Sequence, residues 1–319
     1  MNILAQLFAS PWLGAGGVAF CFIAGNLLLG LFKDRLPRDG GRKFAFNGKL
    51  TAGRPRGAGI ILILVFLAGC LLFVSRQLEY LLYYLMVLCG MLSGYLDDRS
   101  ETPWNEYKKG AIDLAVCLIT ALSFLNFNPD MGSIAIGGWS WQMPPVLFVI
   151  VATAGLWVSI NATNCSDGVD GLCGTLTCVT LTFIGLWGIE TGMDSSMLAA
   201  ILLMIVSILP YLWRNAEPCQ MMMGDAGSRA FGLFIGIAIL KTGNMLLYFP
   251  LCAVLFLDGF LGIVKVSLAR FLKIRIMKNI RTPLHDHFRK NKGWSNGQTV
   301  MRFAIVQTVI SLVLLLLPR

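Results

Sequence analysis

Long apolar stretches recur along the chain, and short polar segments separate them. A helix needs about 20 mostly apolar residues to cross a bilayer, and ten stretches approach or reach that length. They cover residues 12–32, 57–75, 80–96, 111–126, 145–160, 170–189, 197–213, 229–241, 244–269 and 301–318. The alternating segments that form a membrane β-barrel are absent. The pattern therefore predicts an all-α, polytopic membrane protein of ten transmembrane helices, forming a single domain over residues 1–319.

The composition agrees with this class. The chain is 56% hydrophobic and 13% charged, whereas a soluble domain is about 45–50% apolar and about 25% charged. An ordinary soluble enzyme and a disordered chain are both excluded. Most of the nine cysteines lie within apolar stretches and none forms a Cys-x-x-Cys pair, so we expect small buried hydrophobes rather than disulfides or metal ligands.

The net charge of +9 is informative only by position. Basic residues cluster between the first two spans and after the ninth, whereas segments 127–144 and 190–196 contain no Lys or Arg. Basic loops belong on the cytoplasmic side of a membrane. The distribution predicts that both termini are extracytoplasmic, and it indicates membrane orientation rather than binding to nucleic acid.

Four polar clusters fall on the predicted cytoplasmic side, and the last contains both histidines of the chain. The residues that stand out are Asp97, Asp98, Asn164, Asp167, Asp170, Asp225, His285 and His287. Carboxylates are suitable ligands for Mg²⁺, which in turn binds phosphates, and Lys or Arg nearby suits a phosphorylated substrate. The clusters predict metal-assisted phosphoryl transfer at the membrane surface, with an active site on the cytoplasmic face.

Each cluster also has a simpler interpretation. The Asp97-Asp98 pair could be a solvated helix end, Asn164 could form an Asx turn that caps the next helix, and Asp225 could be a helix cap. The two histidines could lie on the surface or bind zinc. Only the coincidence of all four clusters on one side favours a catalytic site.

Asp258 is the one charge that we find deep within an expected span. An ionisable group inside a membrane is costly and usually functional. Either Asp258 lines or supports the substrate site directly, or the ninth span bends at Gly259 and Gly262 and carries Asp258 toward the site.

Taken together, the motifs resemble those of the polyprenyl-phosphate N-acetylhexosamine-1-phosphate transferases. The matching residues are Asp97-Asp98, Asn-Ala-x-Asn-x-x-Asp-Gly-x-Asp-Gly at 161–171, Met-Gly-Asp-x-Gly-Ser at 223–228, and Asn215 ten residues before Asp225. Pro283-x-His285-x-His287-Phe288, followed by Lys292-Gly293-Trp294 and Arg302-Phe303, points to the branch that uses a muramoyl-pentapeptide donor.

The resemblance implies a cytoplasmic Mg²⁺ site in a multi-pass protein of the bacterial cytoplasmic membrane. The reaction would transfer phospho-MurNAc-pentapeptide from UDP-MurNAc-pentapeptide to undecaprenyl phosphate, giving lipid I and UMP. A groove near the bent ninth span would hold the prenyl chain, and the apolar helix faces suit a homodimer.

The resemblance also implies roles for individual residues. Asp225 would bind Mg²⁺, and Asp97, with Asp98 beside it, would be the base for the lipid phosphate. The remaining assignments are Asn164 and Asp167 in the catalytic centre, Asp170 and Asn215 at the uridine, and His285 and His287 at the sugar phosphate.

This chain departs from the family pattern at several positions. Where the family has Lys-x-Gly-Thr-Pro-Thr-Met-Gly-Gly, residues 51–59 read Thr-Ala-Gly-Arg-Pro-Arg-Gly-Ala-Gly. The lysine is lost, so we expect Lys49, Arg54 and Arg56 to supply the charge that binds substrate. Met222 replaces an aromatic residue expected to stack on uracil, and Asp286 replaces the middle histidine of three.

Three other functions fit parts of the pattern. A sibling enzyme would use UDP-GlcNAc, and a membrane prenyltransferase would use Asp-rich motifs to bind Mg²⁺-diphosphate without needing the 164–170 cluster. A transporter would place charges deep in several spans and show internal repeats. A purely structural membrane protein would not explain five aspartates on one face.

Overall fold

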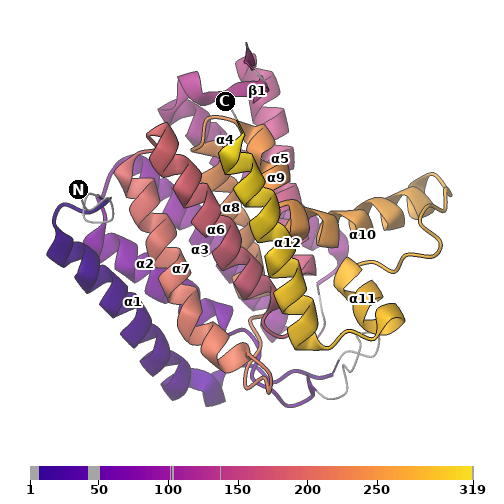
Figure 1. The fold of residues 1–319 in the computed structure, drawn as a ribbon. Helices are drawn as coiled ribbons and strands as arrows, with labels where there is room; N and C mark the ends of the chain where they lie inside the picture. The colour runs from indigo at the N-terminus through magenta and orange to yellow at the C-terminus, as the bar shows by residue number, and fades with distance from the viewer. Residues whose placement is uncertain (1–6, 42–50, 101, 103, 137, 318–319) are drawn as a thin grey trace.

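The computed structural model describes residues 7–41, 51–100, 102, 104–136 and 138–317. A helix coincides with each of the ten apolar stretches, the ninth of which is broken (Figure 1). The helices are α1 (Pro11–Phe32), α2 (Gly59–Phe73), α3 (Leu78–Arg99), α4 (Glu106–Phe127), α5 (Pro145–Cys165), α6 (Leu172–Thr191), α7 (Ser195–Asn215), α8 (Asp225–Leu240), α9 (Tyr248–Leu251), α10 (Ala253–Phe271) and α12 (Asn296–Leu316).

Within the described residues, seven helices are long and apolar enough to span a membrane, and an eighth span results if α9 and α10 are counted together. The other two apolar stretches form shorter helices, because α2 has 15 residues and α8 has 16. The protein is therefore an all-α, multi-pass membrane protein.

Helix α8 is the central element of the bundle. Every one of its residues is buried, and α3, α5, α2 and α6 pack around it. Ala, Gly and Ser at several α8 positions allow the neighbouring backbones to approach closely, as is typical of helix packing in membranes. Because α8 begins at Asp225, this arrangement places that carboxylate in the middle of one end of the bundle.

The ninth span is broken by a bend of 96° between α9 and α10. The break lies at Cys252, before the glycines where a bend was expected. Gln307 of α12 satisfies the backbone groups that the break leaves free. Its Oε1 accepts from Val254 N (2.9 Å) and its Nε2 donates to the Leu251 carbonyl (2.9 Å). Beyond the break, α10 projects away from the bundle (Figure 1).

Short elements connect the helices. They are η2 (Lys33–Arg35), η4 (Pro129–Met131), η5 (Met245–Leu247), the antiparallel strands β1 (Ser133–Ile136) and β2 (Trp139–Gln142), and α11 (Leu284–Lys292). The hairpin occurs in a loop that the apolar pattern left unassigned. Its exposed Trp139 and Trp141 are of the type found at membrane–water interfaces.

Charges inside the helices are more numerous than expected, so the prediction that Asp258 stands alone is wrong. Asp113, Arg229 and Lys241 are also buried. Lys241 Nζ lies 3.0 Å from Glu79 Oε1 and 3.1 Å from Asp194 Oδ2. Each charge has a partner of opposite sign, which is the condition under which such groups are tolerated.

Candidate active site

Acidic residues from two distant segments meet at one end of the bundle. Asp97 and Asp98 lie in the last turn of α3, and Asp225 is the first residue of α8. Arg56, from the segment before α2, connects them. Its Nη2 lies 2.8 Å from Asp98 Oδ1 and 3.3 Å from Asp225 Oδ1. One guanidinium nitrogen thus contacts a carboxylate from each helix.

The backbone around Arg56 is fixed by hydrogen bonds to two other segments. Arg56 N donates to the Pro37 carbonyl (2.8 Å), and Met222 N donates to the Pro55 carbonyl (2.8 Å). The first amides of α2 donate to the carbonyls of Met222 and Met223, which satisfies donors that a helix start leaves unpaired. The segment leading into α2 is therefore attached to the segment leading into α8.

Lys109 and Arg229 lie on the other side of the carboxylates. Lys109 Nζ forms an ion pair with Asp97 and lies 3.9 Å from Asp225 Oδ2. Arg229 Nη2 lies 3.4 Å from Asp225 Oδ2, and its Nη1 lies 3.1 Å from Asp113 Oδ1. Because the Arg229 side chain is only 2% exposed, loss of Asp113 would leave a buried charge with fewer partners, which is strongly unfavourable.

Lys109, Asp113 and Arg229 are not among the residues predicted from the sequence. Arg229 directly follows the motif at 223–228, and Asp113 is an acid within an expected span. Both residues could have been identified from the sequence, because a charged residue within a membrane span needs a partner of opposite charge. Lys109 could not have been identified in this way. It lies in an expected basic cytoplasmic loop, and membrane orientation alone explains basic residues there.

Gly224 allows the close approach of α3 and α8. Its φ is +75°, and a Cβ atom there would lie 2.3 Å from Asp98 Oδ2. The same Oδ2 atom is 3.4 Å from the amide of Ala226 at the start of α8. A helix N-terminus carries partial positive charge, so the end of α8 attracts the Asp98 carboxylate.

The last turn of α5 and the loop after it reach the cluster through Asn164 and Asp167, respectively. Asn164 Oδ1 accepts a hydrogen bond of 2.9 Å from Ser228 Oγ, in the first turn of α8. Burial lowers the pKa of Arg56, but nearby carboxylates, including that of Asp167, raise it above its ordinary value. Arg56 is therefore a permanent cation in this site.

Asp258 connects the loop after α5 to α11. Its side chain is fully buried, and Oδ1 accepts from His285 N (2.8 Å). Oδ2 lies 2.8 Å from His285 Nδ1 and accepts from Ser166 Oγ (2.9 Å). The ring of His285 packs against Gly168, where an added Cβ would lie 2.5 Å from Nε2. Asp258 thus supports the site by holding His285, and does not line its surface.

Asn215 has a comparable supporting position. Its Oδ1 accepts from Gly171 N (2.6 Å), and its Nδ2 donates to the Met221 carbonyl (2.9 Å). These contacts occupy the amide that was expected to meet uridine. Asp170 is closer to the surface and pairs with Arg54 Nη1 at 3.4 Å.

Other predicted residues lie away from the carboxylates or outside the described part of the chain. His287 Nδ1 accepts from Arg281 N (3.3 Å) on a different side of α11 from the buried His285. Asp286, the residue in place of a histidine, pairs with Lys290 Nζ at 2.9 Å. Lys49 lies outside the residues that the structure describes.

The charge balance of the cluster suits a divalent cation. Within the described part of the chain, its ion pairs join five carboxylates (Asp39, Asp97, Asp98, Asp113 and Asp225) to three cations (Arg56, Lys109 and Arg229). Among these groups the carboxylates outnumber the cations by two. Among the described residues no three His, Cys, Asp or Glu side chains are grouped as ligands. Mg²⁺ typically needs only one or two protein carboxylates, with water and substrate phosphates as the other ligands.

Known proteins resemble the chain over most of its length. The pattern of glycosyl transferase family 4 matches residues 80–243. The phospho-N-acetylmuramoyl-pentapeptide-transferase of Treponema pallidum (strain Nichols) is 37% identical over 306 residues, which cover 88% of this chain and 82% of that protein. The protein of the same name from Wolbachia sp. subsp. Drosophila simulans (strain wRi) is 29% identical over 81% of this chain and 82% of its own length. The one from Bartonella quintana (strain Toulouse) is 27% identical over 82% of this chain and 79% of its own length. The chain therefore belongs to glycosyl transferase family 4 and, within it, to the phospho-N-acetylmuramoyl-pentapeptide-transferases.

Proposed function

We propose that the protein transfers phospho-MurNAc-pentapeptide from UDP-MurNAc-pentapeptide to undecaprenyl phosphate, releasing UMP and forming lipid I. The proposed location is the bacterial cytoplasmic membrane, crossed ten times, with the site on the cytoplasmic face and both termini outside. The family supports this chemistry, and one feature of the structure supports the acceptor in particular.

That feature is a groove between α4, α5 and α10, with a cavity volume of about 730 Å³. Apolar side chains line one part of it, among them Leu114, Trp157 and Val266, whereas Lys109 and Arg229 line the other. A phosphate on a long apolar chain matches this division, because the phosphate would contact the cations and the chain would leave along the helices. The phosphate would then lie beside Asp97 and Asp225, where a donor diphosphate must also bind.

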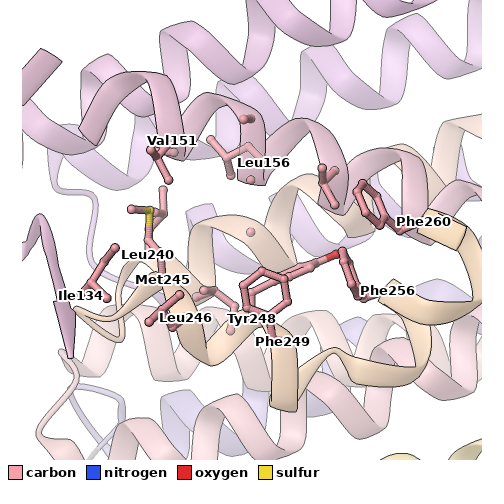
Figure 2. A pocket seen from close by; sticks show the side chains of 16 residues that line it. Ile134, Val151, Leu156, Leu240, Met245, Leu246, Tyr248, Phe249, Phe256 and Phe260 are labelled. Carbon is pink, nitrogen blue, oxygen red and sulfur yellow. The ribbon is translucent and has the colours of Figure 1, made fainter. Parts of the chain in front are cut away.

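A second cavity provides further apolar surface along α5 and α10, which also border the groove. It has a volume of about 360 Å³ between α5, α8, α9 and α10. Leu156, Phe249, Phe256 and Phe260 are among the residues that line it (Figure 2). The cavity lies at the break in the ninth span, so residues of α9 and α10 on either side of the break line it together with residues of α5 and α8. The prenyl chain of the acceptor is the proposed occupant.

The proposed chemistry is direct attack. An oxygen of the lipid phosphate forms a bond to the phosphorus that carries the sugar, and the bond from that phosphorus to the bridging oxygen breaks, so that UMP leaves. In this proposal Asp97 would take a proton from the lipid phosphate, and Lys109 and Arg229 would orient the phosphate and neutralise its charge. Phosphoryl transfer depends mainly on such positioning and charge stabilisation.

Mg²⁺ is the proposed cofactor, with Asp225 and Asp98 as its protein ligands. When bound there it would neutralise the charge that develops on the donor diphosphate. The excess of two carboxylates over cations in the ion pairs of the described residues supports this assignment.

The test is UMP release by detergent-purified protein given undecaprenyl phosphate and Mg²⁺. Release with UDP-MurNAc-pentapeptide but not with UDP-GlcNAc, abolished by chelation and restored by Mg²⁺, is the expected result. Release with UDP-GlcNAc alone would keep the reaction type and assign the protein to the sibling activity. No release with either donor would contradict the proposal.

A further inference from the structure

Arg56 occupies the position where the proposed metal ligands converge. Its Nη2 atom is shared between Asp98 Oδ1 and Asp225 Oδ1, the two carboxylates that would bind the metal. Two cations cannot hold these carboxylates without strong mutual repulsion at such short range. Binding of a divalent cation therefore requires the guanidinium to move.

The structure distinguishes a movable cation from a fixed one. Arg229 is 2% exposed and anchored by Asp113, so it cannot leave the cluster. The side chain of Arg56 is 20% exposed, so it has access to solvent that the Arg229 side chain lacks. Its backbone, by contrast, is held by the Pro37 carbonyl. The side chain can therefore turn about a fixed point.

We propose that Arg56 is a displaceable counterion, which neutralises Asp98 and Asp225 in the metal-free protein and turns to the donor diphosphate when these carboxylates hold a divalent cation. The inference rests on the proposed function. A guanidinium is suited to this exchange, because its planar set of donors binds carboxylate and phosphate oxygens with the same paired geometry.

Arg56 then couples the binding of metal to the binding of nucleotide. Without a diphosphate, displacing Arg56 from the carboxylates weakens metal binding. With a diphosphate in place, Arg56 gains a new partner and this cost falls. Such coupling is reciprocal, so the metal must strengthen nucleotide binding by the same factor.

The experiment measures Mn²⁺ binding to the detergent-purified full chain by electron paramagnetic resonance, with and without UDP. Wild type should bind Mn²⁺ weakly alone and more tightly with UDP. Arg56→Gln should bind Mn²⁺ about tenfold more tightly without UDP, since one repelling charge is gone, and should lose most of the enhancement by UDP. Arg54→Gln is the matched control, because Arg54 pairs with Asp170 and not with the proposed metal ligands. Its Mn²⁺ affinity in the absence of UDP should stay close to that of wild type.

A second measurement covers the case in which Arg56→Gln folds poorly. Arg56→Lys keeps the charge but lacks the paired donors, so it should retain weak Mn²⁺ binding and show a smaller enhancement by UDP. Equal or weaker Mn²⁺ binding by Arg56→Gln, or equal enhancement in all variants, would overturn the inference while leaving the proposed function intact. Mn²⁺ binding unaffected by Asp225→Asn would overturn the metal site itself, and the inference with it.

Discussion

Asp258 provides the most direct test of how the site is supported. Its carboxylate accepts hydrogen bonds from the His285 amide, the His285 ring and Ser166 Oγ at 2.8, 2.8 and 2.9 Å. Asp258→Ala would leave all three groups buried without this partner. Each such loss costs about 1–3 kcal/mol, and partial relaxation should reduce the total to about 3–5 kcal/mol of the free energy of unfolding.

Asp258→Asn separates stability from positioning. The amide has nearly the same shape, and its oxygen can still accept from the His285 amide. Its NH₂ group would replace Oδ2, and the Ser166 hydroxyl can turn to accept from it, so the free energy of unfolding should fall by only about 1–2 kcal/mol. Its NH₂ group, however, would face Nδ1 and favour the ring form that carries its proton on Nε2. We therefore expect UMP release to fall far more than stability, with a changed ¹⁵N signal of His285.

The assay is denaturant titration in mixed micelles alongside UMP release. Asp286→Asn is the control, because Asp286 is next to His285 but partly exposed. It forms an ion pair with Lys290, and ion pairs near the surface contribute about 0–1 kcal/mol to stability. If Asp258→Ala and Asp286→Asn unfold at the same denaturant concentration, the role assigned to Asp258 is wrong. Unchanged turnover in Asp258→Asn would reject the positioning of His285 specifically.

Three further predictions concern the charge cluster and the loop after α5. Asp225→Asn should abolish Mg²⁺-dependent UMP release while the protein still purifies as a folded species, and normal turnover would reject the metal assignment. Lys109→Ala should raise KM for undecaprenyl phosphate at least tenfold. Lys108→Ala is the control and should change KM little, because Lys108 Nζ lies over the Trp104 ring, 3.6 Å from its centroid. Equal effects on KM would reject Lys109 as the phosphate contact. Gly168→Ala places a Cβ 2.5 Å from His285 Nε2, so the ring or the loop must shift and turnover should fall; a fully active variant would show that this contact is not required.

The membrane class and the location of the helices were predictable from the chain alone. Apolar length sets where helices form in lipid, because each backbone group must be paired within its own segment. The four polar clusters were also visible, since Asp98, Asn164, Asp225 and His285 lie beside such stretches. The break before α10 could not be placed, because Gln307 stabilises it from α12, 53 residues away from Val254 in the chain.

The roles of single residues depended on contacts between distant segments. Asp258 stood out in the sequence, but only the fold shows that it holds His285. Asn215 belonged to a motif, yet its side-chain amide forms hydrogen bonds with the backbone of Gly171 and Met221. A motif identifies which residues matter and gives no information on which of them face the substrate.

The sequence by itself determined that this protein is a multi-pass helical membrane protein with clusters of acidic residues beside its apolar stretches, because hydrophobic length and charge position are local properties. The tertiary structure alone decided which charges compensate one another. Arg56 precedes α2, Lys109 and Asp113 lie in α4, and Arg229 lies in α8, and their partners are set by how the helices pack around α8. Electrostatic interactions depend on distance in space and on burial, and neither is encoded in the neighbourhood of a residue along the chain.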